Sequence, residues 1–173
     1  MNPLKSYTIP IMGLESGQHE FRFEIGSEFL SIFDNSLIDS GLFTVEVSLD
    51  KKVNILTLHF DIKGYMDTPC DRCLESIKLP IENAFDIHLK YSDEYKEEED
   101  IIYITKNTNE INVGNQIYEM ISLSVPIAKV YDCDEDESAP CNDDVLEHLN
   151  RGSSNEDEDN EDTSIWDVLK DLK

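Results

Sequence analysis

With 173 residues, the chain is long enough to bury one hydrophobic core and too short for several domains of ordinary size. Its 38 acidic and 14 basic side chains give a formal net charge of −24, which disfavours direct electrostatic binding to the phosphate backbone of RNA or DNA. Basic proteins are favoured as partners instead, although an acidic surface that only keeps the protein soluble fits the same composition.

The start of the chain lacks the apolar core of a secretion signal, and no stretch approaches the apolar length of a membrane span. We therefore expect a cytoplasmic protein without membrane association, whose cysteines stay reduced.

Hydrophobic and polar residues alternate through most of the first ninety positions, which is the pattern of strands with one buried face. The alternation predicts strands at 21–25, 43–49, 56–62 and 85–91. Asp50-Lys51-Lys52 lies between the second and third of these strands, so we expect them to form a hairpin.

The remaining apolar patterns are short. They predict a helix at 27–33, a strand at 101–104, a helix at 115–124 with Asn115 as its N-cap, and a helix at 143–150. The expected fold class is therefore α+β. Its core is expected to be a mainly antiparallel β-sheet, open and barrel-like, with a few short helices and a CxxC knuckle.

Composition divides the chain into four parts. Residues 1–131 are expected to form the β-rich core domain, and 132–150 an acidic, cysteine-containing segment that packs on it. Residues 151–162 lack residues that could be buried and are expected to be a disordered acidic linker. From Asp132 to Lys173 there are 16 acidic and 3 basic residues, so this part carries −13 of the charge.

Residues 163–173 have the pattern of an amphipathic helix. Ser164 and Asp167 match a capping box. The apolar side chains at helical spacing are Ile165, Val168, Leu169 and Leu172, with Trp166 alongside them. Because a helix this short is marginal in water, it requires a surface, either the groove of a partner or the chain's own domain.

The four cysteines form two pairs, Cys70 with Cys73 and Cys133 with Cys141. Two close pairs in a chain without a secretion signal favour a metal site over a disulfide framework. Four thiolates satisfy a tetrahedral zinc ion, so we expect a structural zinc site made by these four residues. Cys70 and Cys73 are expected at the tip between two extended segments.

Other interpretations of the cysteines stay open. Cys133 and Cys141 have seven residues between them, which is a weak zinc signal, and His148 is the alternative fourth ligand if only three cysteines bind. One alternative is a thiol- or zinc-dependent redox enzyme that uses Cys70 and Cys73. It requires a strand-to-helix turn, whose helix N-terminus lowers the thiol pKa, whereas the segment after these cysteines is predicted to be extended. A metal-buffering protein is a third class.

No pattern in the sequence indicates an enzyme. His19, His59 and His88 fall on the polar phase of predicted strands, where an exposed residue is the simplest interpretation. The chain has no glycine-rich phosphate loop, nucleophile elbow or HExxH motif. We therefore expect no catalytic residues and no small-molecule substrate.

The layout resembles the YceD family of large ribosomal RNA subunit accumulation proteins. The shared features are a strand-rich first half, a CxRC-L turn at Cys70 to Leu74, an acidic loop, a helix before Val125-Pro126, further cysteines, and a C-terminal helix with Trp166. The resemblance spans about residues 21–173. One departure is Thr163-Ser164-Ile165-Trp166, where family members often carry Asp-Pro-Arg-Trp.

The resemblance implies a non-enzymatic role in the accumulation or processing of large-subunit (23S) ribosomal RNA, and hence in ribosome biogenesis. It supports Cys70 and Cys73 more than the second cysteine pair. Because the chain is so acidic, we expect it to associate with ribosomal RNA indirectly, as an adaptor that binds basic ribosomal or ribosome-assembly proteins.

Overall fold

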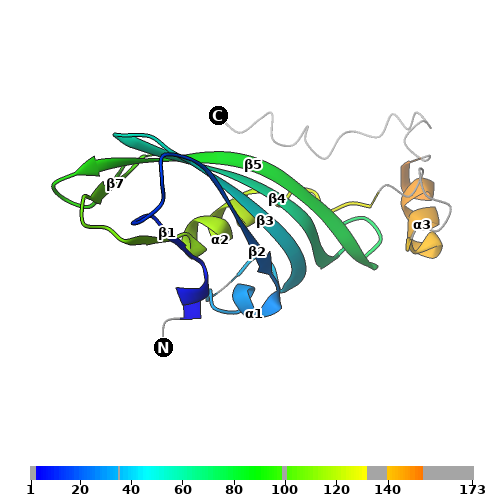
Figure 1. The fold of residues 1–173 in the computed structure, drawn as a ribbon. Helices are drawn as coiled ribbons and strands as arrows, with labels where there is room; N and C mark the ends of the chain where they lie inside the picture. The colour runs from blue at the N-terminus through cyan, green and yellow to red at the C-terminus, as the bar shows by residue number, and fades with distance from the viewer. Residues whose placement is uncertain (1–2, 35, 99–100, 132–139, 154–173) are drawn as a thin grey trace, which may run out of the picture.

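The computed structural model describes residues 3–34, 36–98, 101–131 and 140–153. Within these ranges the chain forms strands and short helical segments (Figure 1). The strands are β1 (Thr8–Pro10), β2 (Gly17–Ile25), β3 (Ser40–Lys51), β4 (Ile55–Pro69), β5 (Ser76–Ser92), β6 (Lys96–Glu98), β7 (Ile101–Thr105) and β8 (Glu110–Asn112). The helical segments are η1 (Pro3–Ser6), α1 (Ser27–Leu30), α2 (Gly114–Leu123) and α3 (Asp143–Ser153).

Six of the strands form one sheet in the order β2-β3-β4-β5-β7-β6, and β1 pairs with β8 in a second, two-stranded sheet. All neighbours in the large sheet are antiparallel except β5 and β7, which run parallel. The sheet does not close into a barrel. The predicted α+β class and the predicted hairpin, now β3 with β4, are confirmed.

The core lies on the concave side of this strongly curved sheet. Figure 1 shows α1 and α2 on that side, beneath β3, β4 and β5. Every second residue of the long strands faces inward, because successive side chains point to opposite faces of a sheet. The inward set includes Phe43, Val45, Val47, Leu49, Leu56, Leu58, Phe60, Ile62, Ile87 and Leu89, all buried. Helix α2 buries Ile117 and Ile121 in the same cluster.

The helices differ in detail from the prediction. The predicted N-cap at Asn115 is wrong, because α2 begins at Gly114 with Val113 in the cap position. The side chain of Asn112, at the end of β8, accepts a hydrogen bond from the Gly114 N–H instead (3.1 Å). Among the described residues, no helix is long and apolar enough to cross a membrane.

The C-terminal part of the chain is described only as far as α3. This helix continues to Ser153, three residues into the segment expected to be a disordered linker. Val145 and Leu146 of α3 pack against the hydrophobic core. The expected division of the chain into four parts stays a prediction. The rest of the linker and the predicted helix at 163–173 lie outside the described residues.

Candidate functional site

The turn between β4 and β5 holds the first cysteine pair at the tip between two extended segments, as the sequence predicts. Cys70 is 0% exposed and Cys73 is 1% exposed, and both are free thiols. The Leu74 N–H donates to the Cys70 carbonyl (2.9 Å), and the Cys70 N–H donates to the Glu75 carbonyl (2.8 Å). These bonds satisfy backbone groups of the turn and fix its shape.

The Cys70 sulfur lies among several hydrogen-bond donors. Burial raises the pKa of the Cys70 thiol, but the backbone N–H groups of Tyr131, Cys73 and Arg72 and the Cys73 thiol lower it more, to about 7. Donors that point at a sulfur favour its charged form. The arrangement therefore makes a thiolate accessible near neutral pH, as a metal ligand or a nucleophile requires.

A distant segment docks on this turn. The Asp71 N–H donates to the Lys129 carbonyl (2.8 Å), and the Lys129 N–H donates to an Asp71 carboxylate oxygen (2.7 Å). On the other side, the Asn142 side-chain amide donates to the Glu75 carboxylate (3.3 Å). The turn thus contacts both the chain that leads toward Cys133 and the chain that follows Cys141.

The predicted zinc ligands are only partly visible. Cys133 lies outside the described residues, and His148 is exposed on α3. Cys141 is half-buried and disulfide-bonded, so it needs reduction before it can ligate zinc. Among the described residues, no three or more histidine, cysteine or carboxylate side chains gather where they could hold a metal ion. The four-cysteine site stays a prediction.

The geometry gives less support to redox catalysis. Cys73 is followed by β5 and not by a helix, so the strand-to-helix turn that the redox function requires is not formed at this cysteine pair. Thiol–disulfide exchange also requires a second sulfur to approach the nucleophile, and both sulfurs are buried. The site fits a buried structural element better than a surface for substrates.

His59 and His88 occupy the polar face of the sheet. His59 and Asp86 form a cross-strand pair (2.5 Å) with both side chains about half exposed. The His88 ring lies 3.2 Å from the Thr57 hydroxyl on the same face. The expectation for His19 is wrong, because His19 is paired with the buried Leu49 and therefore lies on the same face as the core residues. None of the three histidines lines the pockets beside Phe29, Val47 or Gly64, and their interpretation as ordinary strand residues stays a prediction.

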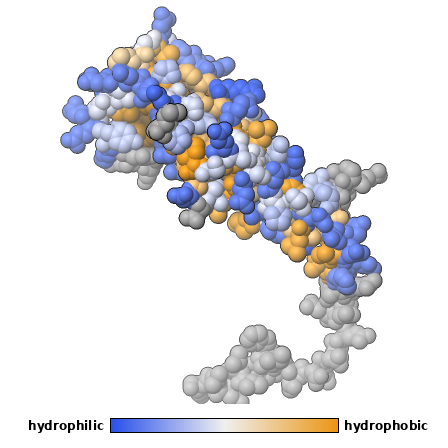
Figure 2. Space-filling view, turned by 90° about the horizontal axis from the view of Figure 1, so that it is seen from below, coloured by the Kyte–Doolittle hydropathy of each residue, from blue (hydrophilic) through white to orange (hydrophobic). Residues whose placement is uncertain are grey.

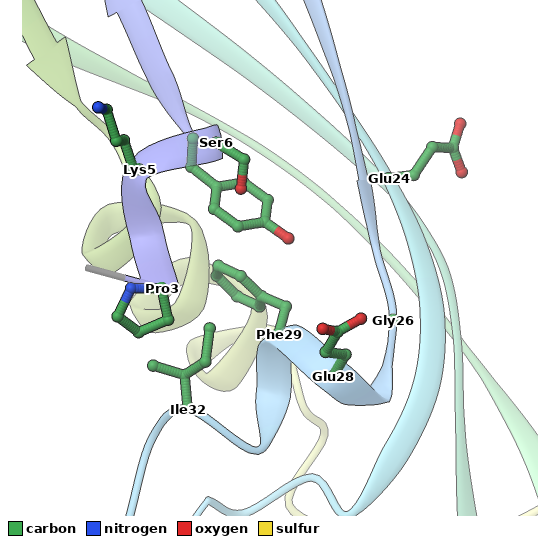
Figure 3. A pocket seen from close by; sticks show the side chains of 9 residues that line it. Pro3, Lys5, Ser6, Glu24, Gly26, Glu28, Phe29 and Ile32 are labelled. Atoms are coloured by element: carbon green, nitrogen blue, oxygen red, sulfur yellow. The ribbon is translucent and has the colours of Figure 1, made fainter. Parts of the chain in front are cut away.

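A cavity of about 780 Å³ lies between the N-terminal segment and the end of β2 (Figure 3). It is lined by Pro3, Lys5, Ser6, Tyr7, Glu24, Gly26, Glu28, Phe29 and Ile32. Burial and the nearby Glu28 carboxylate raise the pKa of the Tyr7 phenol. In Figure 3 the side chains of Lys5 and Glu24 both point away from Phe29. The polar groups do not converge on one point, as a binding site for a small ligand requires.

The apolar side chains predicted to bind a partner, Ile165, Trp166, Val168, Leu169 and Leu172, lie outside the described residues. Sequence patterns did not predict another feature, the exposed apolar surface around Leu74. Alternation and helical spacing locate buried faces, whereas this surface is made by a turn and an irregular segment.

In a comparison with protein families, one family model matches residues 58–173 of this chain. The matching model describes the large ribosomal RNA subunit accumulation protein YceD. The matched part begins in β4 and includes the cysteine turn, α2 and α3, whereas the residues that line the 780 Å³ cavity precede it. No curated protein and no solved structure matches the chain. The chain therefore belongs to the YceD family of large ribosomal RNA subunit accumulation proteins.

Proposed function

We propose that this protein supports accumulation of large-subunit ribosomal RNA as a non-enzymatic adaptor for basic ribosomal or ribosome-assembly proteins. Membership of the YceD family supports the ribosomal role. The net charge of −24 is the observation that carries the adaptor role, because such a chain repels RNA and attracts basic proteins.

The surroundings of the basic side chains support the same choice. Arg22 lies 3.1 Å from Glu24, and Lys63 lies 3.2 Å from Asp61, on the polar face of the sheet. Lys51 donates to two backbone carbonyls near the N-terminus. These cations contact the protein's own acceptors, so they are poorly placed to form the clustered basic surface that phosphate binding requires.

The predicted zinc ion would be a structural component of this adaptor. Cys70, Cys73, Cys133 and Cys141 would hold it, and it would tie the acidic C-terminal part to the β-rich core. The pKa of Cys70, about 7, is the one observation that favours the alternative redox function. Burial of both sulfurs and the strand after Cys73 oppose it.

Cells that lack the protein are expected to accumulate less large ribosomal subunit than small subunit. Sucrose-gradient profiles of ribosomal subunits, with and without a plasmid copy of the gene, measure this directly. A normal ratio of subunits in the deletion strain, under conditions where the protein is normally made, would contradict the ribosomal role.

Removing residues 154–173 is expected to reduce the recovery of ribosomal proteins in pull-downs from cytoplasmic extract. The deletion removes the predicted docking helix and residues 154–162 of the acidic linker but leaves α3 intact. A full-length chain with Ile165, Trp166 and Leu169 changed to serine keeps the charge and tests the apolar face alone. Equal recovery with all three chains would exclude a role of this segment in partner binding.

A further inference from the structure

Leu74 has an unusual backbone conformation for its residue type. Its φ is 62°, and it is the one non-glycine residue with positive φ among the described residues. This left-handed conformation brings Cβ close to the following carbonyl oxygen, so glycine usually occupies it. The Leu74 side chain is 74% exposed, so it gains little from burial in return. A strained residue that does not serve the core is a reason to look for a function.

Further apolar side chains are exposed next to this turn. Ile127 is fully exposed and Val130 is 39% exposed. The two hydrogen bonds between Asp71 and Lys129 hold their segment against the turn that carries Leu74. We call Leu74, Ile127 and Val130 the Leu74 patch. In Figure 2, hydrophobic residues remain exposed on the part of the body nearest α3.

Exposed acidic side chains lie in the cysteine turn and in the helix that is linked to it. Asp71 and Glu75 are exposed in the same turn. Asp143, Asp144 and Glu147 are exposed on α3, whose first turn is joined to the cysteine turn through Asn142 and Glu75. Of the nearby basic residues, Arg72 and Lys129 are only partly exposed, and the exposed Lys78 of β5 lies over the Tyr65 ring (4.4 Å to its centroid). An apolar surface beside these carboxylates is complementary to a segment that is both apolar and basic.

We propose that the Leu74 patch is a docking surface for an amphipathic, basic segment of a partner protein. The proposal rests on the proposed adaptor function and specifies the surface that performs it. All three residues lie in the part of the chain that matches the family.

The chain's own C-terminal segment is a poorer occupant of the patch. Residues 154–162, which lead to the predicted C-terminal helix, contain six acidic and no basic side chains. The carboxylates of the cysteine turn and of α3 repel such a segment and attract a basic one.

Binding of a designed peptide to the full-length protein tests the proposal. The probe is a fluorescein-labelled 14-residue amphipathic helix of leucine and lysine, measured by fluorescence anisotropy at physiological salt. A peptide with leucines changed to serine keeps the charge, and a peptide with lysines changed to glutamate keeps the apolar face. We expect the parent peptide to bind at least about tenfold more tightly than either.

Leu74→Gly and Ile127→Ser are expected to weaken binding of the parent peptide about tenfold each, without changing the protein's charge. Leu74→Gly should leave the melting temperature unchanged or higher, because glycine accepts positive φ without strain. Val53→Ser is the matched control, because Val53 is 85% exposed in the β3–β4 hairpin.

Three outcomes would overturn the proposal. Equal effects of Val53→Ser and Ile127→Ser would mean that the peptide has no specific site. Unchanged binding by Leu74→Gly and Ile127→Ser would place the site elsewhere. A tenfold gain in affinity on Trp166→Ser would make the chain's own C-terminal helix the occupant. None of these results alters the pull-down or the subunit profiles, which test the adaptor function separately.

Discussion

Replacing Gly64 with alanine is expected to lower the free energy of unfolding by roughly 3 kcal/mol or more. Gly64 lies in β4, where the neighbouring strand β3 approaches very closely. A Cβ atom at Gly64 would overlap the carbonyl oxygen of Leu42 and lie 2.6 Å from the Cα of Phe43. Both obstacles are backbone atoms, so a side-chain rotation cannot relieve the clash. The strands must separate, and the pairing of β3 with β4 runs through the centre of the sheet.

Gly26→Ala is the control for this prediction. Gly26 has a φ of −121°, and a Cβ atom there would meet no heavy atom within 4 Å. Its effect on stability should stay within about 0.5 kcal/mol, because neither strain nor a clash is introduced. Urea denaturation followed by circular dichroism measures both variants. Similar midpoints for Gly64→Ala and the parent would show that the strands can move apart at little cost.

The sequence alone predicted strands β2, β3, β4, β5 and β7 of the large sheet, but not β6. For the long strands it also predicted the buried face. Phe43, Val45, Val47 and Leu49 share one phase of the alternation, and all are buried in β3. The prediction succeeds because a strand with one buried face has apolar residues at every second position of the sequence. The turn at Cys70 and Cys73 was placed correctly for a related reason, since extended patterns flank it on both sides.

Partners between strands are harder to predict than the strands themselves. The apolar run at 101–104 predicted a strand but not its neighbour, and β7 pairs in parallel with β5. Likewise, the docking of Lys129 on Asp71 joins residues 58 positions apart, largely through backbone atoms. Every residue has these backbone groups, so contacts between them produce no side-chain pattern from which they could be predicted.

The exposure of Leu74 could not be predicted for the same reason. A leucine after a cysteine pair suggests a buried residue, because leucine is usually found inside. The left-handed backbone at this position directs the side chain to solvent, and that conformation follows from the hydrogen bonds of the whole turn. The family motif contains the residue, but only the structure shows which way the side chain points.

Purification under reducing conditions is expected to yield about one zinc ion per chain, because four thiolates complete a tetrahedral site. Cys70→Ser is expected to reduce the zinc content to near zero and to lower the free energy of unfolding by roughly 3 kcal/mol or more. The physical reason lies in the surroundings of Cys70. Its sulfur is buried and accepts backbone hydrogen bonds that stabilise the thiolate, and zinc binds the thiolate form.

Elemental analysis of the parent, Cys70→Ser and His148→Gln proteins distinguishes the possible ligand sets. If the four cysteines are the ligands, the His148→Gln protein should retain its zinc. Loss of the metal from this variant would show that His148 is a ligand in place of one cysteine. A chelator should lower the melting temperature of the parent but not of Cys70→Ser, because only the parent has metal to lose. A metal-free parent in which Cys70 and Cys73 form a reversible disulfide would contradict the structural zinc site. That result would favour the redox alternative, since these two sulfurs would then be the reactive groups of the turn.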